Sequence, residues 1–115
     1  MSMSRLFSET IAMYRKHGWQ LKRVLLRKET RAEVSGEATE LFNDASQMDA
    51  EINALWFARA SHGTREAWEL RLIGEPPYAL FETFEQDEAE EDREDVRREM
   101  EARLRDYAAG RAQSS

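Results

Sequence analysis

Three short runs between residues 52 and 85 alternate between apolar and polar positions and predict three consecutive β-strands. The runs are INALWFARA, REAWELRLI and YALFETF. Successive side chains of a strand point to opposite faces of a sheet, so an alternating run places one face against a core. Turn-forming residues separate the runs at positions 61–64 and 74–77. The segment therefore predicts an antiparallel meander.

The even-numbered residues of the first two runs form the predicted core face. A three-residue turn with Gly63 in the left-handed conformation would pair Trp56 with Trp68. A two-residue turn would instead pair Trp56 with Glu69, because a slip of one residue reverses every side chain of a strand. We therefore predict the bulged turn, with the two tryptophans facing each other.

The odd-numbered face of the meander is also apolar. A solvated sheet face normally carries polar residues, so this face needs a cover. The cover is either a helix or loop of the same chain, or a second subunit or bound partner, because contiguous apolar patches mark interaction surfaces. The candidate partner or dimer face consists of Leu55, Phe57, Ile73 and Phe81.

Helical spacing of apolar residues predicts a first helix, with Ser4 as its N-cap and Gly18 at its end. Residues 19–27 follow as a strand, and their clustered basic side chains favour an edge position. Residues 29–49 are predicted to be a connector with one or two helical turns. A last helix carries a narrow apolar stripe among charged residues, formed by Val96, Met100, Leu104 and Tyr107.

These elements predict an α+β fold. Its four-stranded antiparallel sheet consists of one strand plus the three-stranded meander, and the N-terminal and C-terminal helices both pack on one face. A chain of 115 residues suits one domain. We expect a single α+β domain over residues 4–109 and a frayed tail over residues 110–115.

Composition narrows the class of protein. The chain has no cysteine, which excludes disulfides and thiolate chemistry. The N-terminus has no apolar signal region, and the longest apolar run, residues 54–58, is too short to cross a bilayer. We expect a cytoplasmic protein with no membrane role.

Charge is divided between two zones of opposite sign. Residues 85–106 carry eleven acids and five arginines, whereas residues 15–31 carry seven basic residues and one acid. The zones could partly neutralise each other, each could be only a solvated face, or the basic zone could contact nucleic acid. The net charge of −6 argues against a phosphate partner. The candidate basic patch consists of Arg15, Lys16, Lys22, Arg23, Arg27, Lys28 and Arg31.

No residue pattern indicates catalysis. His17 and His62 are isolated, and the chain lacks a phosphate loop, a nucleophile motif and metal-ligand spacing. We expect no catalytic residue, no metal and no cofactor, and therefore not an enzyme. The alternative is a small-molecule-binding domain or small enzyme built around the sheet aromatics Trp56, Trp68 and Tyr78.

Two resemblances accompany this interpretation. His17, Gly18 and Trp19 before a basic strand resemble the opening of small bacterial toxins with a double-stranded-RNA-binding-like fold, although the Gly-Ser-His segment of those toxins is absent. The helix-sheet-helix plan is similar to that of small bacterial secretion chaperones. The expected function is a non-catalytic protein-interaction or adaptor module, with itself or another protein as partner.

Overall fold

The computed structural model describes residues 2–43, 45–74 and 77–113. The described helices and strands, in chain order, are α1 (Met3–Lys16), β1 (Gln20–Leu26), α2 (Lys28–Val34), α3 (Ala38–Phe42), β2 (Ser46–Asp49), β3 (Ala54–Ala60), β4 (Glu66–Leu72), β5 (Tyr78–Phe84) and α4 (Glu90–Gln113).

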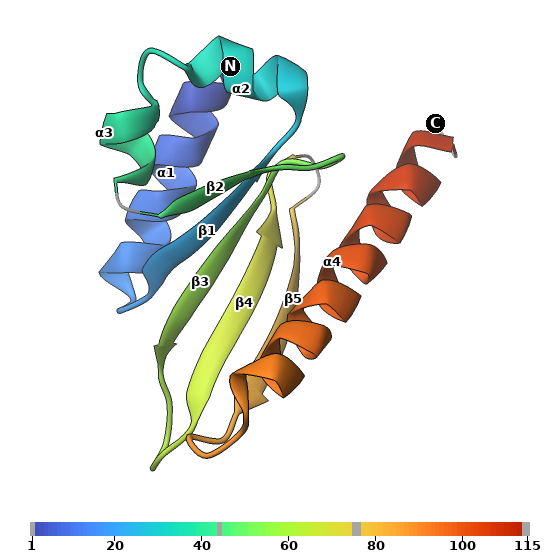
Figure 1. The fold of residues 1–115 in the computed structure, drawn as a ribbon. Coiled ribbons are helices and arrows are strands. Elements are labelled where there is room, and N and C mark those ends of the chain that lie inside the picture. Colours follow the sequence, from blue (N-terminus) through green and yellow to red (C-terminus); the bar gives the residue numbers. More distant parts are fainter. Residues whose placement is uncertain (1, 44, 75–76, 114–115) are drawn as a thin grey trace.

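The predicted α+β class is confirmed, but the sheet differs in detail. It is a mixed five-stranded sheet with the order β2-β1-β3-β4-β5 (Figure 1). The strands β3, β4 and β5 form the predicted antiparallel meander, and β1 pairs with β3 in antiparallel fashion. The fifth strand, β2, runs parallel to β1. Its sequence SQMD is exposed throughout, so no apolar alternation marks it as a strand.

The predicted edge position of residues 19–27 is wrong. β1 lies inside the sheet because β2 pairs with its outer side. The basic residues of β1 therefore do not protect a sheet edge from pairing. The two edges of the sheet are β2, which has four residues, and β5, which has seven.

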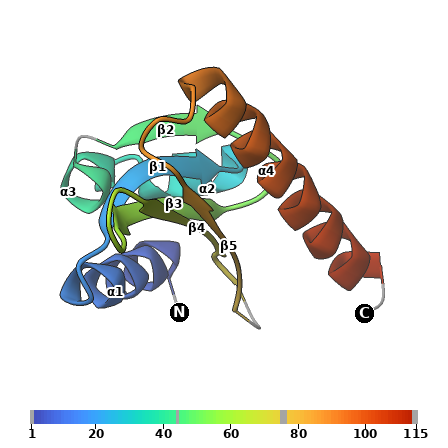
Figure 2. The same ribbon diagram turned by 90° about the horizontal axis from the view of Figure 1, so that it is seen from below.

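The prediction that both terminal helices pack on one face is wrong. α1 covers one face together with α2 and α3, whereas α4 covers the other face (Figure 2). The physical reason lies in the sheet itself, because both of its faces are apolar and each needs a cover. α1 supplies the cover that the odd-numbered face requires.

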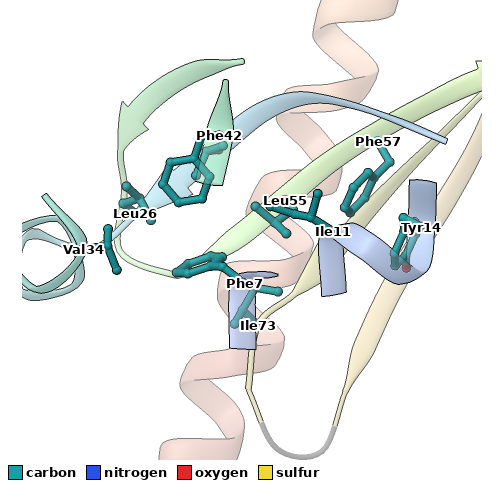
Figure 3. Packing of buried hydrophobic residues seen from close by; sticks show 10 residues of the cluster. Phe7, Ile11, Tyr14, Leu26, Val34, Phe42, Leu55, Phe57 and Ile73 are labelled. Carbon is teal, nitrogen blue, oxygen red and sulfur yellow. The ribbon is translucent and has the colours of Figure 1, made fainter. Parts of the chain in front are cut away.

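Three residues of the candidate partner face lie in the core beneath α1. Leu55 and Phe57 are fully buried and Ile73 is nearly so. They pack with Phe7 and Ile11 of α1 (Figure 3). The same chain therefore covers most of this face, and only Phe81 of the four candidate residues is exposed.

The register between β3 and β4 differs from the prediction by two residues. Trp68 lies opposite Ala58 and not opposite Trp56. A longer loop over residues 61–65 replaces the three-residue turn, with Gly63 at φ +65°. A shift of two residues preserves the faces, so the two tryptophans remain neighbours with ring centroids 5.8 Å apart.

The ends of the elements also depart from the sequence prediction. The N-cap of α1 is Ser2, whose hydroxyl accepts a hydrogen bond from the Arg5 amide, and not Ser4. α4 continues to Gln113, whereas Ser114 and Ser115 of the predicted tail lie outside the described residues. Positions 75 and 76 of the predicted second turn also lie outside them.

Candidate functional site

Phe81 is the most exposed large apolar side chain among the described residues. Its exposed fraction is 58%, whereas the other four phenylalanines of the chain are at most 1% exposed. Phe81 lies in the middle of β5, on the α1 side of the sheet and beyond the part that α1 covers. Phe81 is thus the one phenylalanine of the chain that the fold leaves exposed.

The outer edge of β5 is an open sheet edge. β5 pairs with β4 on one side and is the last strand of the sheet (Figure 1). The backbone N–H of Thr83 donates to the carboxylate of Glu82 at 3.0 Å, so this N–H points away from β4. Because backbone groups alternate along a strand, the N–H groups of Ala79 and Phe81 point outward as well.

Trp19 borders the exposed phenylalanine. The Trp19 and Phe81 ring centroids are 6.5 Å apart in an edge-to-face arrangement. The guanidinium of Arg59 lies 5.1 Å from the Trp19 ring centroid and donates to the carbonyl oxygen of His17 at 2.8 Å. Trp19, Arg59 and Phe81 therefore form one surface, and Trp and Arg are the residue types that dominate binding energy in protein interfaces.

The end of α1 sets the position of Trp19. The N–H of Gly18 donates to the carbonyl of Arg15, and the N–H of Trp19 donates to the carbonyl of Tyr14. Gly18 has φ +86°, so this is a Schellman motif with its glycine in the left-handed conformation. The accompanying apolar contact is the Tyr14–Trp19 pair, with ring centroids 6.0 Å apart.

A polar cluster surrounds the hydroxyl of Tyr14. The Tyr14 hydroxyl donates a hydrogen bond to the Glu69 carboxylate. The Tyr14 ring stacks on the Phe57 ring, with ring centroids 4.0 Å apart. The Arg71 guanidinium approaches the same hydroxyl at 3.5 Å. Burial, together with the hydrogen bond to Glu69, raises the pKa of Tyr14 to about 12.

We predict an alkaline loss of stability that depends on Tyr14. The folded state raises this pKa above its usual value of 10.0, so the contribution is fully present below pH 10 and is lost as pH rises toward 12. The wild-type protein should lose up to roughly 2 kcal/mol more than Tyr14→Phe across this range. Chemical denaturation at several alkaline pH values measures the difference. Equal pH slopes for the two proteins would contradict the prediction.

A groove of about 490 Å³ lies beside Trp19. It lies between the end of α1, the start of β1 and the end of α3. The residues that matter for its chemistry are Arg15, Trp19, Leu21, Lys22, Asn43 and Ala45. No acidic residue is among the described residues that line it.

Lys22 reaches this position through a β-bulge. In the pairing of β1 with β3, Leu21 lies opposite Phe57 and Arg23 lies opposite Trp56, so Lys22 is the extra residue. The bulge also changes which residues share a face, because Leu21 and Val24 pack in the same cluster. Bulges re-aim side chains and are frequent next to functional sites.

The basic patch is divided between paired and unpaired side chains. Arg23, Arg27 and Arg31 form ion pairs with Glu94, Glu29 and Asp49. The other four, Arg15, Lys16, Lys22 and Lys28, form no ion pair with a described residue. Arg23 and Glu94 join the two charge zones through a bidentate pair at 2.9 and 3.2 Å.

A second polar cluster attaches α4 to the sheet. Arg97 is 1% exposed, lies 4.5 Å from the Trp68 ring centroid and forms ion pairs with Glu90 and Glu94. Hydrogen bonds from Arg23, assisted by Arg97, hold the pKa of Glu94 below its usual value. The Nη1 atom of Arg97 has no hydrogen-bond partner among the described atoms. The face of the Trp68 indole, which lies against this guanidinium, can accept a weak hydrogen bond. This cluster is balanced in charge, so we assign it a structural role.

The three aromatic residues of the sheet that could have formed a small-molecule site pack against other side chains of the chain. Trp56 is fully buried, and its Nε1 donates to Glu101 at 2.8 Å. Trp68 is nearly buried beneath Arg97. Tyr78 stacks on Tyr107 of α4 with ring centroids 3.8 Å apart. α4 therefore covers the three aromatics that the sequence offered for a ligand.

Two negative findings apply to the described part of the chain. No group of three His, Cys, Asp or Glu side chains there is arranged to hold a metal ion. No described helix combines the length and the apolar composition needed to cross a bilayer, and α4, with 24 residues, is highly charged.

Comparison with known proteins gives no family. No protein-family model, curated protein or solved structure matches the chain. Function is therefore inferred from the surfaces described above.

The sequence indicated some of these residues and missed others. Phe81, Arg15 and Lys22 belonged to the candidate sets, whereas Trp19, Glu82 and Asn43 did not. Trp19 carried a usable signal, because an aromatic directly after a helix-ending glycine often contacts the last turn. The roles of Glu82 and Asn43 depend on backbone geometry that no sequence pattern reveals.

Proposed function

We propose that the protein is a non-catalytic interaction module that binds through the edge of β5, and that a second copy of this chain is the occupant of that edge. The observation that carries the proposal is the exposure of Phe81 at the middle of an open edge strand. An open edge with an apolar side chain is a template for pairing with another strand.

The geometry of β5 favours a copy of itself. The strand runs from residue 78 to residue 84, so an antiparallel pair related by a two-fold axis at Phe81 matches the strands over their full length. Ala79 then lies opposite Thr83 of the other copy. These are the residues whose N–H groups point outward, so each pair can exchange two backbone hydrogen bonds. The two Phe81 side chains become neighbours on the same face.

Glu82 opposes this pairing and limits its strength. Its carboxylate accepts the hydrogen bond from the Thr83 N–H that the other copy would use. Its charge would also lie close to the corresponding charge of the second copy. Charged residues on edge strands are a common protection against unwanted pairing. We therefore expect a weak, reversible dimer whose dissociation constant lies in the micromolar range, and not an obligate dimer.

Sedimentation equilibrium of three proteins tests the proposal. The wild-type protein should show a monomer–dimer equilibrium, Phe81→Ser should shift it toward monomer, and Glu82→Ala should shift it toward dimer. Removal of Phe81 should weaken association by at least about tenfold, because a central aromatic anchor contributes about 2 kcal/mol or more. All three proteins should unfold at similar denaturant concentrations, because both side chains are exposed.

Phe57→Ser and Met48→Ser are the matched controls. Phe57 lies on the same face but is buried under α1, so its loss should destabilise the fold. Met48 is exposed on β2, the opposite edge, and its replacement should leave association unchanged. If wild type and Glu82→Ala were both monomeric throughout the micromolar range, β5 would not be the binding edge.

A further inference from the structure

The helix α4 runs along β5, on the side of the sheet that ends in the open edge (Figure 1). At one end, the Arg93 guanidinium lies 5.7 Å from the Phe84 ring centroid. At the other end, the Tyr107 ring stacks on the Tyr78 ring with centroids 3.8 Å apart. The helix between these two contacts rises about 21 Å, and the strand between them rises about 20 Å. α4 and β5 are therefore antiparallel and advance in step.

One side of α4 faces the middle of the sheet. The Glu94 carboxylate binds Arg23 of β1, and Glu101 accepts a hydrogen bond from Trp56 of β3. Both β1 and β3 lie farther from the open edge than β4 does. The opposite side of the helix therefore faces outward, toward the open edge of β5.

The outward side of α4 carries charges of both signs. Its residues, here called the outer row, are Asp92, Val96, Glu99 and Arg103. Their spacing of four, three and four places them in one line along a helix. The line continues to Tyr107, which contacts β5. The charged members of the row are exposed, with the acids nearer the start of α4 and the arginine nearer its end.

A two-fold axis at Phe81 also relates the two α4 helices of a dimer. Phe81 is the middle residue of β5, and Met100 lies midway between the two α4 residues that contact the ends of the strand. The axis therefore places a second α4 antiparallel to the first, with residue 100 of both copies at the same level. Arg103 of one copy then lies within about 3 Å of rise from both Val96 and Glu99 of the other.

We propose that the outer row of α4 is a second layer of the dimer interface, in which Glu99 of each copy binds Arg103 of the other. This contact rests on the proposed pairing of β5, and it determines which partner that edge accepts. The charges of the row are self-complementary about an axis whose position was fixed by β5 alone. A partner that lacks this pattern would place like charges against the row, and such repulsion is a common source of specificity.

Reciprocal charge variants of the full-length protein test the contact. Arg103→Glu carries acids at both positions, and Glu99→Arg carries arginines at both. At low ionic strength each variant alone should dimerise about tenfold more weakly than wild type, because both contacts of its symmetric dimer become repulsive. An equimolar mixture should form a heterodimer about as tightly as wild type forms its dimer, because both contacts then join Glu to Arg. Sedimentation equilibrium of each variant and of the mixture measures the difference.

The mixture separates a contact between copies from a contact within one helix. Glu99 and Arg103 are also spaced for an ion pair within a single helix, and such a pair predicts no preference for the heterodimer. Arg98→Glu and Glu91→Arg are the matched controls, because they make the same changes of net charge at exposed positions on another side of α4. Each control variant and their mixture should dimerise nearly as wild type does.

The outcomes distinguish the α4 contact from the β5 pairing. If wild type dimerises but the mixture associates no more tightly than either variant alone, the α4 contact is wrong and the β5 pairing is unaffected. An equal heterodimer preference in the control mixture would show a diffuse charge effect and would also overturn the contact. Phe81→Ser in both variants should dissociate the heterodimer. If wild type, Glu82→Ala and the mixture are all monomeric over the micromolar range, both proposals are wrong.

Discussion

Trp56→Ala is expected to lower the free energy of unfolding by about 3–5 kcal/mol, the largest effect of any single substitution considered for this protein. Trp56 is fully buried between the sheet and α4. The substitution removes the packing against Trp68 and the hydrogen bond from Nε1 to Glu101. It would leave a cavity that the flanking strands cannot close, because they are held in register on both sides. Chemical denaturation monitored by far-ultraviolet circular dichroism measures the loss.

Met48→Ala provides the comparison for an exposed position. Met48 lies on β2 and is 40% exposed, so its truncation should change stability by less than about 0.5 kcal/mol. If Trp56→Ala unfolded at nearly the same denaturant concentration as Met48→Ala, α4 would not pack on this face as described.

Arg97→Ala is expected to cost about 3 kcal/mol. Arg97 is buried against Trp68 and Phe84 and binds Glu90 and Glu94. Its removal takes the central member from the cluster that fixes α4 to the sheet. Glu94 keeps its pair with Arg23, which holds the expected cost at the lower end of the range for broken buried pairs.

Arg98→Ala is the matched control on the same helix. Arg98 pairs with Asp95, and both side chains are at least 70% exposed. An ion pair of this kind contributes little, so the variant should differ from wild type by less than about 0.5 kcal/mol. Equal denaturation midpoints for the Arg97 and Arg98 variants would show that the buried cluster does not hold α4.

The meander could be predicted because its residues alternate cleanly. Ala54, Trp56 and Leu70 share the even-numbered face, and their placement survives the error of two residues in register. The faces depend on parity alone, whereas the register depends on the loop length at residues 61–65. Turn-forming residues in this loop do not determine its length.

Two other features of the fold, the strand β2 and the bulge in β1, could not be predicted from the sequence pattern. β2 has four residues, all on the surface, so its pairing with β1 is not marked by any apolar alternation in its sequence. The bulge at Lys22 changes the alternation of β1, so Leu21 and Val24 share a face, whereas an uninterrupted strand would place them on opposite faces. The bulge and the placement of α1 both affect the candidate sites. The bulge positions a groove cation, and the assignment of α1 to the odd-numbered face buries most of the predicted partner surface.

The face of the sheet on which Phe81 lies could be predicted from the sequence, but its exposure could not. The sequence placed it correctly on an apolar face with Leu55, Phe57 and Ile73. Only the structure separates it from them, because α1 covers the strands near the middle of the sheet and leaves β5 uncovered. The extent of cover by a helix depends on its crossing angle and length, which the spacing of its apolar residues does not specify.

Amide hydrogen exchange along β5 tests the interaction proposal most directly. The N–H groups of Ala79 and Phe81 point outward and should exchange rapidly in dilute protein, whereas those of Leu80 and Glu82 point toward β4 and provide an internal reference. If two copies pair through β5, protection of Ala79 and Phe81 will increase with protein concentration while protection of Leu80 and Glu82 stays constant. Rapid exchange of Ala79 and Phe81 at every concentration would contradict the proposal.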